Sequence, residues 1–245
     1  ALADLGESLA GLDAARRVES LVATRLLPQA ELALQSALVA YETGKVDVLP
    51  GGSVENFDVP RLSKLKNTCV TGAGWEFFSP HSWLWLNNRS GPTANKKFRQ
   101  ALMFAIDRNM AKDVVWNGLG KVATGPSGSA IKYYTSAVPK YDYDPAKAKA
   151  LLKEAGYNGE KLRMLPLPYG ETWQRWAEMV RQNLQDVGIN VDMVATDVPG
   201  WNQKVSEWDY DIAFTYLYQY GDPALGVGRN YISSQIAKGS PFNNV

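Results

Sequence analysis

The sequence is short of residue types on which several protein chemistries depend. Its 245 residues include one cysteine, Cys69, and one histidine, His81. A single cysteine excludes a disulfide framework within the chain and a cysteine-rich metal site. A single histidine excludes a two-histidine metal site. It also leaves His81 as the only base for a Ser-His-Asp triad, and no nucleophile elbow accompanies it. We therefore expect His81 to be an ordinary loop or surface residue.

Charge of one sign and long apolar runs are also lacking. The chain has 26 Lys and Arg against 25 Asp and Glu, a formal net charge of +1. A nucleic-acid binder usually shows a basic excess or stripe, so no nucleic-acid partner is expected. No apolar run reaches the roughly eighteen residues of a transmembrane helix. The glycine pairs at 118–120 and 226–228 lack the spacing of a dinucleotide or phosphate-binding loop.

What the chain does contain is apolar and aromatic material. Hydrophobic residues make up 45% of it and aromatic residues 11%, which is typical of a folded protein. The length can bury one large core or two modest ones. Residues 1–40 differ from the rest, because twenty of them are Ala or Leu and none is aromatic. We expect this segment to be helical.

Hydrophobic periodicity and capping residues predict a succession of helices and strands. The stretch 118–143 is rich in Gly, Ser and Pro, and we expect a wrapped surface segment or a functional loop there. The order after residue 160 is βαβαβ, which predicts a sheet with helical crossovers. Ligands of such sheets bind beyond the carboxyl ends of the strands. Helices are expected at 29–43, 58–65, 96–106, 108–116, 145–155, 171–187 and 198–207, and strands at 46–49, 68–78, 83–87, 161–167, 189–195 and 211–218.

Three tyrosines recur at period two where the last predicted strand ends: Tyr216, Tyr218 and Tyr220. This spacing places three phenol rings on one face. Tyrosine combines apolar area with a polar tip, which suits a binding cleft, and plain packing is the alternative. The aromatic runs 75–78 and 83–86 add large rings, at least half of which core packing explains. No carboxylate pair is set up for acid–base chemistry.

Four segments carry a resemblance to a known family: 41–47 (YETGKVD), 98–108 (FRQALMFAIDR), 118–126 (GLGKVATGP) and 141–157 (YDYDPAKAKALLKEAGY). A fifth, QDVGINV, follows in the family's order. On these motifs the chain from Tyr41 onwards resembles the central and later part of the family 5 extracytoplasmic solute-binding proteins. These are the dipeptide- and oligopeptide-binding components of ABC transporters.

The resemblance implies an α/β fold, a periplasmic-binding-protein-like (type II) lobe with βαβ units and helices on both sheet faces, plus part of a second lobe. Residues 1–40 match the family poorly, 41–90 would be part of lobe one, and 91–245 would be lobe two, the ligand-binding domain. Because the family is considerably longer, we expect a fragment or a partial chain, with a true short variant as the alternative.

The resemblance also implies a function without catalysis, cofactor or metal. Two lobes would close over a small peptide or peptide-like solute and deliver it to an inner-membrane ABC permease. The implied location is periplasmic or extracytoplasmic, and the implied state is a monomer when full length. The first residues do not read as a signal peptide, because Asp4, Glu7 and Asp13 interrupt any apolar core.

In relatives, an Asp shortly before an Asp-Pro pair often binds the amino group of the ligand. Aligned on Asp222-Pro223, that position is Gln219 here, which carries no charge. A blocked peptide, an opine or a sugar-like or other polar solute therefore stays open. Asp222 is a substitute anchor or a turn residue, and Arg229 a carboxylate clamp or a surface salt bridge. The candidate contacts are Tyr216, Tyr218, Gln219, Asp222, Trp201, Arg229, Phe78 and Trp75.

Two other classes of function stay open. One is a hydrolase or transferase with a pocket beyond the βαβ strands, although a single histidine makes its machinery hard to assemble. The other is a structural or scaffold module whose Ala- and Leu-rich start is a partner helix.

Overall fold

A computed structural model describes residues 37–50, 53–226 and 228–239 of the chain. The chain separates into two compact units, residues 1–58 and 59–245. In the first unit residues 37–42 are helical and residue 43 is a turn, so the described part of the predicted helix 29–43 is confirmed to within one residue. The remainder of that prediction, and the helical prediction for residues 1–36, lie outside the described residues. Residues 46–49 take irregular backbone instead of the expected strand, because they pair with no described strand.

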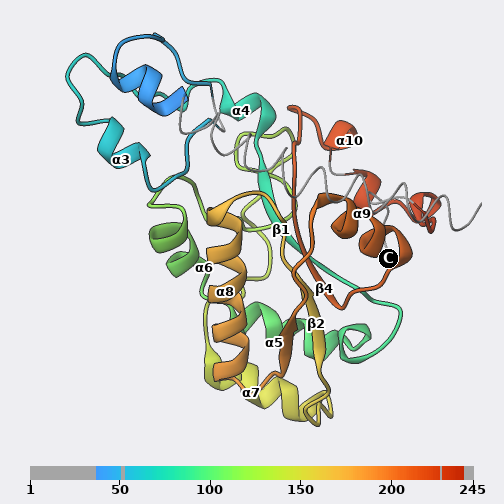
Figure 1. Cartoon of the computed structure of the whole chain (residues 1–245). Helices are drawn as coiled ribbons and strands as arrows, with labels where there is room; N and C mark the ends of the chain where they lie inside the picture. The colour runs from blue at the N-terminus through green and yellow to red at the C-terminus, as the bar shows by residue number, and fades with distance from the viewer. Residues whose placement is uncertain (1–36, 51–52, 227, 240–245) are drawn as a thin grey trace, which may run out of the picture. The chain divides into compact units, whose positions relative to one another are not determined.

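The second unit is built around a four-stranded mixed sheet (Figure 1). Its spatial order is β1-β4-β2-β3. β4 runs antiparallel to β1 and parallel to β2, and β2 runs parallel to β3. The predicted βαβαβ succession is confirmed. The strands are β1 (His81–Leu86), β2 (Leu162–Leu165), β3 (Val191–Met193) and β4 (Ile212–Leu217).

The partner of β1 is the last strand of the chain's sheet, β4. β1 pairs with β4 over its whole length, with His81 opposite Leu217 and Leu86 opposite Ile212. This pairing places residues 81–86 in the sheet of the second unit. Strand pairing joins residues that are distant in sequence, so local periodicity does not reveal it. The assignment of the units to two lobes of a longer protein stays a prediction.

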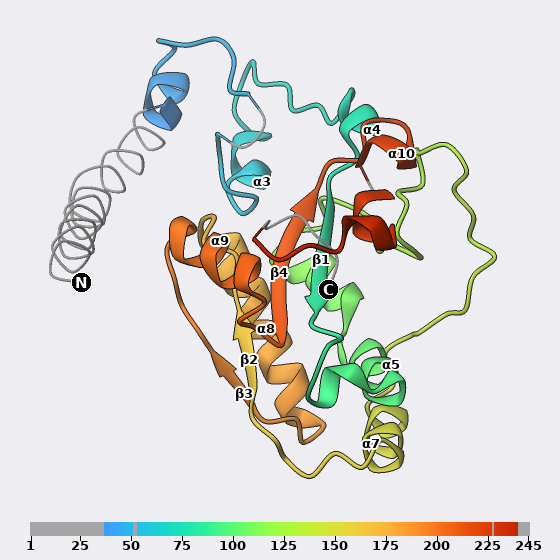
Figure 2. The same cartoon turned by 90° about the vertical axis from the view of Figure 1, so that its right-hand side faces the viewer.

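Helices cover both faces of this sheet, with α8 (Glu171–Asp186) on one and α9 (Val198–Glu207) on the other (Figures 1 and 2). On β4, Phe214 contacts Trp176 of α8, with ring centroids 4.8 Å apart. The neighbouring Ala213 pairs with Trp85, whose ring contacts Trp201 of α9 at 6.4 Å. Successive residues of a strand point to opposite faces, so the two helices lie on opposite sides.

The other helical elements connect and flank the sheet. The predicted helices at 96–106 and 145–155 are confirmed within a residue or two. The remaining elements are α3 (Val59–Leu62), α4 (Trp75–Phe78), η2 (Pro92–Ala94), α5 (Lys96–Ala105), α6 (Arg108–Met110), the π-helical turn η3 (Ala111–Val115), α7 (Pro145–Glu154), α10 (Pro223–Gly226), η4 (Gly228–Asn230) and η5 (Ser233–Gln235).

Two aspartates begin helices as the sequence predicts. An Asp107 side-chain oxygen accepts from the backbone N–H of Met110 at 2.9 Å. An Asp144 oxygen accepts from the N–H of Lys147 at 2.9 Å, and Pro145 occupies the first turn. Each bond satisfies a backbone donor that has no partner within its helix.

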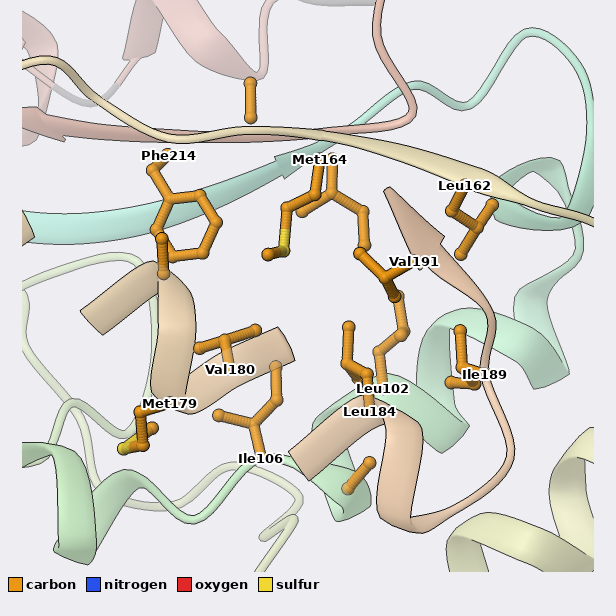
Figure 3. Packing of buried hydrophobic residues seen from close by; sticks show 14 of the residues in the cluster. Leu102, Ile106, Leu162, Met164, Met179, Val180, Leu184, Ile189, Val191 and Phe214 are labelled. Atoms are coloured by element: carbon orange, nitrogen blue, oxygen red, sulfur yellow. The ribbon is translucent and has the colours of Figure 1, made fainter. Parts of the chain in front are cut away.

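The hydrophobic core of this unit lies between the sheet and the helices (Figure 3). Met164 and Phe214 from the strands face Val180 and Leu184 of α8, and Leu102 of α5 closes the same layer. Each fully buried side chain of this kind contributes about 1.5–3 kcal/mol to stability. Among the described residues, no helix combines the length and the apolarity needed to cross a bilayer.

Candidate functional site

The row of three tyrosines predicted from the spacing is present where β4 ends. The ring centroids of Tyr216 and Tyr218 are 5.4 Å apart, and those of Tyr218 and Tyr220 are 5.9 Å apart. Tyr216 also contacts Trp173 of α8 at 5.6 Å. The tyrosine row therefore continues the α8 face of β4 beyond the buried core.

A second group of aromatic rings comes from α4. The sequence pattern predicted a strand over 68–78, but residues 75–78 form a single helical turn. Gly74 and Ser79 flank this turn with φ values of 92° and 40°, both in the left-handed region. Such backbone breaks a strand, and Gly74 adopts it without steric cost. The turn leaves Trp75 and Phe78 39% and 43% exposed.

The two groups meet across a pocket of about 400 Å³. The ring of Phe78 lies 5.8 Å from that of Tyr218, 6.3 Å from that of Tyr220 and 6.0 Å from that of Trp75. Large apolar surface left open to solvent beside a pocket is typical of a binding site. The lining residues are Ala73, Gly74, Trp75, Phe78, Tyr218 and Tyr220.

Gln219 lies between the two pocket tyrosines in sequence, yet its side chain is completely buried. Its Oε1 accepts from the backbone N–H of Gly128 at 2.8 Å. Its Nε2 donates to the carbonyl oxygen of Pro126 at 3.0 Å and lies 2.8 Å from Nδ1 of His81. Both N–H groups and the oxygen of the amide thus have partners within the chain. This geometry favours a role in positioning the site over the direct solute contact that we expected.

His81 is not the loop or surface residue that we expected. It is the first residue of β1, and burial lowers its pKa to about 4. The imidazole is therefore neutral at physiological pH. The expectation failed because β1 begins two residues earlier than the aromatic pattern indicated.

The remaining candidate contacts lie in different surroundings. Asp222 accepts from the backbone N–H of Ala224 at 2.9 Å, which is the turn role weighed against an anchor. Trp201 of α9 is 5% exposed, belongs to the hydrophobic core and does not line the pocket. The side chain of Arg229 lies outside the described part of the structure.

Three features of the site were not among the contacts predicted from the sequence. Tyr220 lines the pocket, and its place in the tyrosine row was the signal for it. Ala73 and Gly74 line it as well, and small residues before an aromatic run give no such signal. The contact of Gln219 with residues 126–128 joins positions more than ninety apart in sequence. Only the unusual length of the 118–143 segment pointed to it.

A group of charged residues at the start of β4 forms structural pairs away from this pocket. Arg163 of β2 binds both Asp209 and Asp211, and Lys204 binds Asp209 at 2.6 Å. The Lys204 ammonium and the Arg163 guanidinium hold the pKa of Asp209 below its ordinary value. Within the described ranges, no cluster of His, Cys, Asp and Glu has the arrangement of a metal site. Asp209 and Asp211 are therefore paired with cations at the start of a strand and are not arranged as an acid–base pair.

The family model described as "Bacterial extracellular solute-binding proteins, family 5 Middle" matches residues 34–238. The chain belongs to this family. Its members are solute-binding proteins of ABC transporters rather than enzymes, so the hydrolase or transferase alternative finds no support.

Individual proteins and solved structures are similar to this chain. The glutathione-binding protein GsiB of Pectobacterium atrosepticum is 36% identical over 118 residues, which cover 48% of this chain and 23% of that protein. The substrate-binding protein CtaP of Listeria monocytogenes matches with a TM-score of 0.75 and 24% identity, over 86% of this chain and 43% of that one.

The periplasmic binding protein DppA of Helicobacter pylori, solved with the peptide STSA, matches with a TM-score of 0.71 and 23% identity. That match covers 86% of this chain and 41% of DppA. The two solved structures confirm the type II periplasmic-binding-protein fold. The chain thus spans less than half the length of each of these three relatives.

Proposed function

We propose that this chain is the ligand-binding part of the receptor subunit of an ABC importer, and that the aromatic pocket holds part of a peptide or peptide-like solute. The observation that carries the proposal is the position of the pocket. It lies where the last strand of a βαβ sheet ends, and partly exposed aromatic rings line it. Ligands of open α/β sheets bind at such an edge.

Two relatives support a peptide-like solute. GsiB is a glutathione-binding protein, and DppA was solved with a four-residue peptide. In this chain, Trp75, Phe78 and Tyr218 are the proposed direct contacts, with Tyr216 behind Tyr218. Arg229 keeps its proposed role as a carboxylate clamp, one turn after α10.

Family membership also supports the remaining parts of the proposal. A family 5 receptor works outside the cytoplasm and passes its solute to a membrane permease, so we assign this chain an extracytoplasmic location and an ABC permease as partner. The interlobe cleft would be completed by parts of a longer protein, and the full-length receptor would act as a monomer.

Calorimetric titration with a panel of solutes tests the proposal. The panel contains glutathione, the peptide STSA, a blocked peptide, an opine and a disaccharide. We expect at least one peptide-like member to bind, and Tyr218→Ala to weaken it about tenfold or more, since burial of a large side chain contributes about 1.5–3 kcal/mol. The matched control is Tyr143→Ala, an exposed tyrosine outside the pocket. A folded chain that binds no member of the panel would refute the proposal.

A further inference from the structure

Two neighbouring backbone groups fix the orientation of the Gln219 amide, because one can only donate a hydrogen bond and the other can only accept one. The backbone N–H of Gly128 can only donate, so it must face Oε1. The carbonyl of Pro126 can only accept, so it must face Nε2. Nε2 is then also the atom that faces Nδ1 of His81. His81 must accept this bond and is neutral, with its proton on Nε2.

Gln219 also holds the two walls of the pocket together. Its backbone N–H donates to the carbonyl oxygen of Phe78 at 2.7 Å, at the end of α4. Its sequence neighbours Tyr218 and Tyr220 form the opposite wall. Through its backbone and its amide, this one residue thus ties α4, the start of β1 and the 126–128 segment to the end of β4.

The 126–128 segment approaches so closely that a side chain at Gly128 would collide. A Cβ atom there would lie 2.3 Å from Oγ of Ser79 and 3.6 Å from Oε1 of Gln219. Ser79 directly follows the aromatic turn of α4. The segment and the turn are therefore packed as one unit around the buried amide.

The resulting pocket is apolar and uncharged. The lining side chains carry no formal charge, and the amide of Gln219 is completely buried, with both N–H groups committed to Pro126 and His81. The only polar groups of the lining side chains are the indole N–H of Trp75 and the two tyrosine hydroxyls. A buried carboxylate of a ligand would find no cation among these side chains. The carboxylate of Glu76, on α4, is already bound by the backbone N–H of Gly74 at 2.8 Å.

From these contacts we infer that Gln219 is a positioning residue for the pocket, and that the pocket takes an uncharged aromatic group of the solute. The inference rests on the proposed function and names the class of group that the site selects. A ligand ring would make the same edge-to-face contacts that Phe78 makes with the other lining rings at 5.8–6.3 Å.

Blocked tripeptides that differ only in the central side chain test the class of group. The probes are N-acetyl-Ala-Phe-Ala-amide and its versions with central Ala, Lys or Asp, titrated calorimetrically into the chain. We expect the Phe probe to bind about tenfold or more tighter than the Ala probe. The Lys and Asp probes should bind no tighter than the Ala probe. A Lys probe that matches the Phe probe would overturn the inference and indicate a cation–π site.

Replacement of the amide tests the positioning role. Gln219→Met keeps the length of the side chain but makes none of its three hydrogen bonds, and Gln100→Met is the control at a glutamine of α5 outside the pocket. We expect Gln219→Met to weaken the Phe probe about tenfold or more and Gln100→Met to leave its Kd unchanged. A Gln219→Met chain that is folded and binds the Phe probe like the parent would overturn this role.

If Gln219→Met fails to fold, the hydrogen bonds of Gln219 can still be tested on the parent chain, by NMR of the His81 imidazole. His81 is the only histidine, so its imidazole ¹⁵N signals need no assignment. We expect the Nε2–H tautomer from pH 7 down to about pH 5. An Nδ1–H tautomer would overturn the hydrogen-bond scheme. If members of the solute panel bind but the Phe probe binds no tighter than the other tripeptides, the aromatic class is refuted and the proposed function stands. If no probe and no panel member binds, the proposed function is refuted as well.

Discussion

The side-chain amide of Gln219, the residue between the pocket tyrosines Tyr218 and Tyr220, donates to Nδ1 of His81 across 2.8 Å. The bond joins the last residues of the β4 segment to the first residue of β1. It requires a neutral imidazole, and burial lowers the pKa of His81 to about 4. The protonation of one residue is therefore linked to the stability of the site.

We expect the free energy of unfolding to fall as the pH drops from 6.5 to about 4. The unfolded chain, with an ordinary histidine pKa of 6.5, takes up a proton in this window that the folded chain does not. The shift corresponds to at most about 3 kcal/mol. Urea unfolding of the parent and of His81→Asn at several pH values measures it. The variant should lack this part of the slope, and identical slopes would contradict the account.

Gly128→Ala should destabilise the fold by about 1–2 kcal/mol, because its new methyl group would overlap Oγ of Ser79. Ser79→Ala removes that oxygen, so the loss should be smaller in the Gly128→Ala, Ser79→Ala double variant. Thermal unfolding of the single and double variants gives the coupling energy. Strictly additive effects would show that the two residues do not meet.

Asp144→Ala should lower stability by about 1 kcal/mol, because the backbone N–H of Lys147 loses its partner at the start of α7. Asp142→Ala, two residues earlier in the irregular segment, is the control and should change stability by less than about 0.5 kcal/mol. Chemical denaturation compares the two variants. Equal effects would mean that the cap does not stabilise the helix.

Phe214→Ala should be far more destabilising, by about 3–5 kcal/mol, because it opens a cavity between β4 and α8. Phe214 has no exposed surface and packs edge-on against Trp176. The control is Phe77→Ala, since that ring is 58% exposed and should cost less than about 1 kcal/mol. A small loss at Phe214 in denaturant titrations would mean that the core is packed differently.

Local signals in the sequence predicted much of the fold. Asp107 and Asp144 cap helices where a capping residue precedes a periodic run. The bounds of α9 match the predicted 198–207, and period two at the end of β4 gave the tyrosine row. Each of these features depends on neighbours within a few residues, which the sequence displays directly.

Features that depend on distant residues were not predictable in this way. The strand pairing of β1 with β4 joins His81 to Leu217, and no local pattern encodes that choice. The aromatic run 75–78 satisfies a strand pattern, yet the left-handed backbone at Gly74 and Ser79 makes it a helical turn. From the sequence we interpreted Gln219 as an uncharged ligand anchor. Its burial involves contacts with residues distant in sequence, among them His81, Pro126 and Gly128, which no local pattern reveals.

The most direct test of the account is a crystal structure of the chain with the tightest-binding member of the solute panel. The account predicts solute density in the pocket, against the rings of Phe78 and Tyr218, with the Gln219 amide still bound to Gly128 and His81. A solute bound elsewhere on the chain, with the aromatic pocket unchanged, would contradict it.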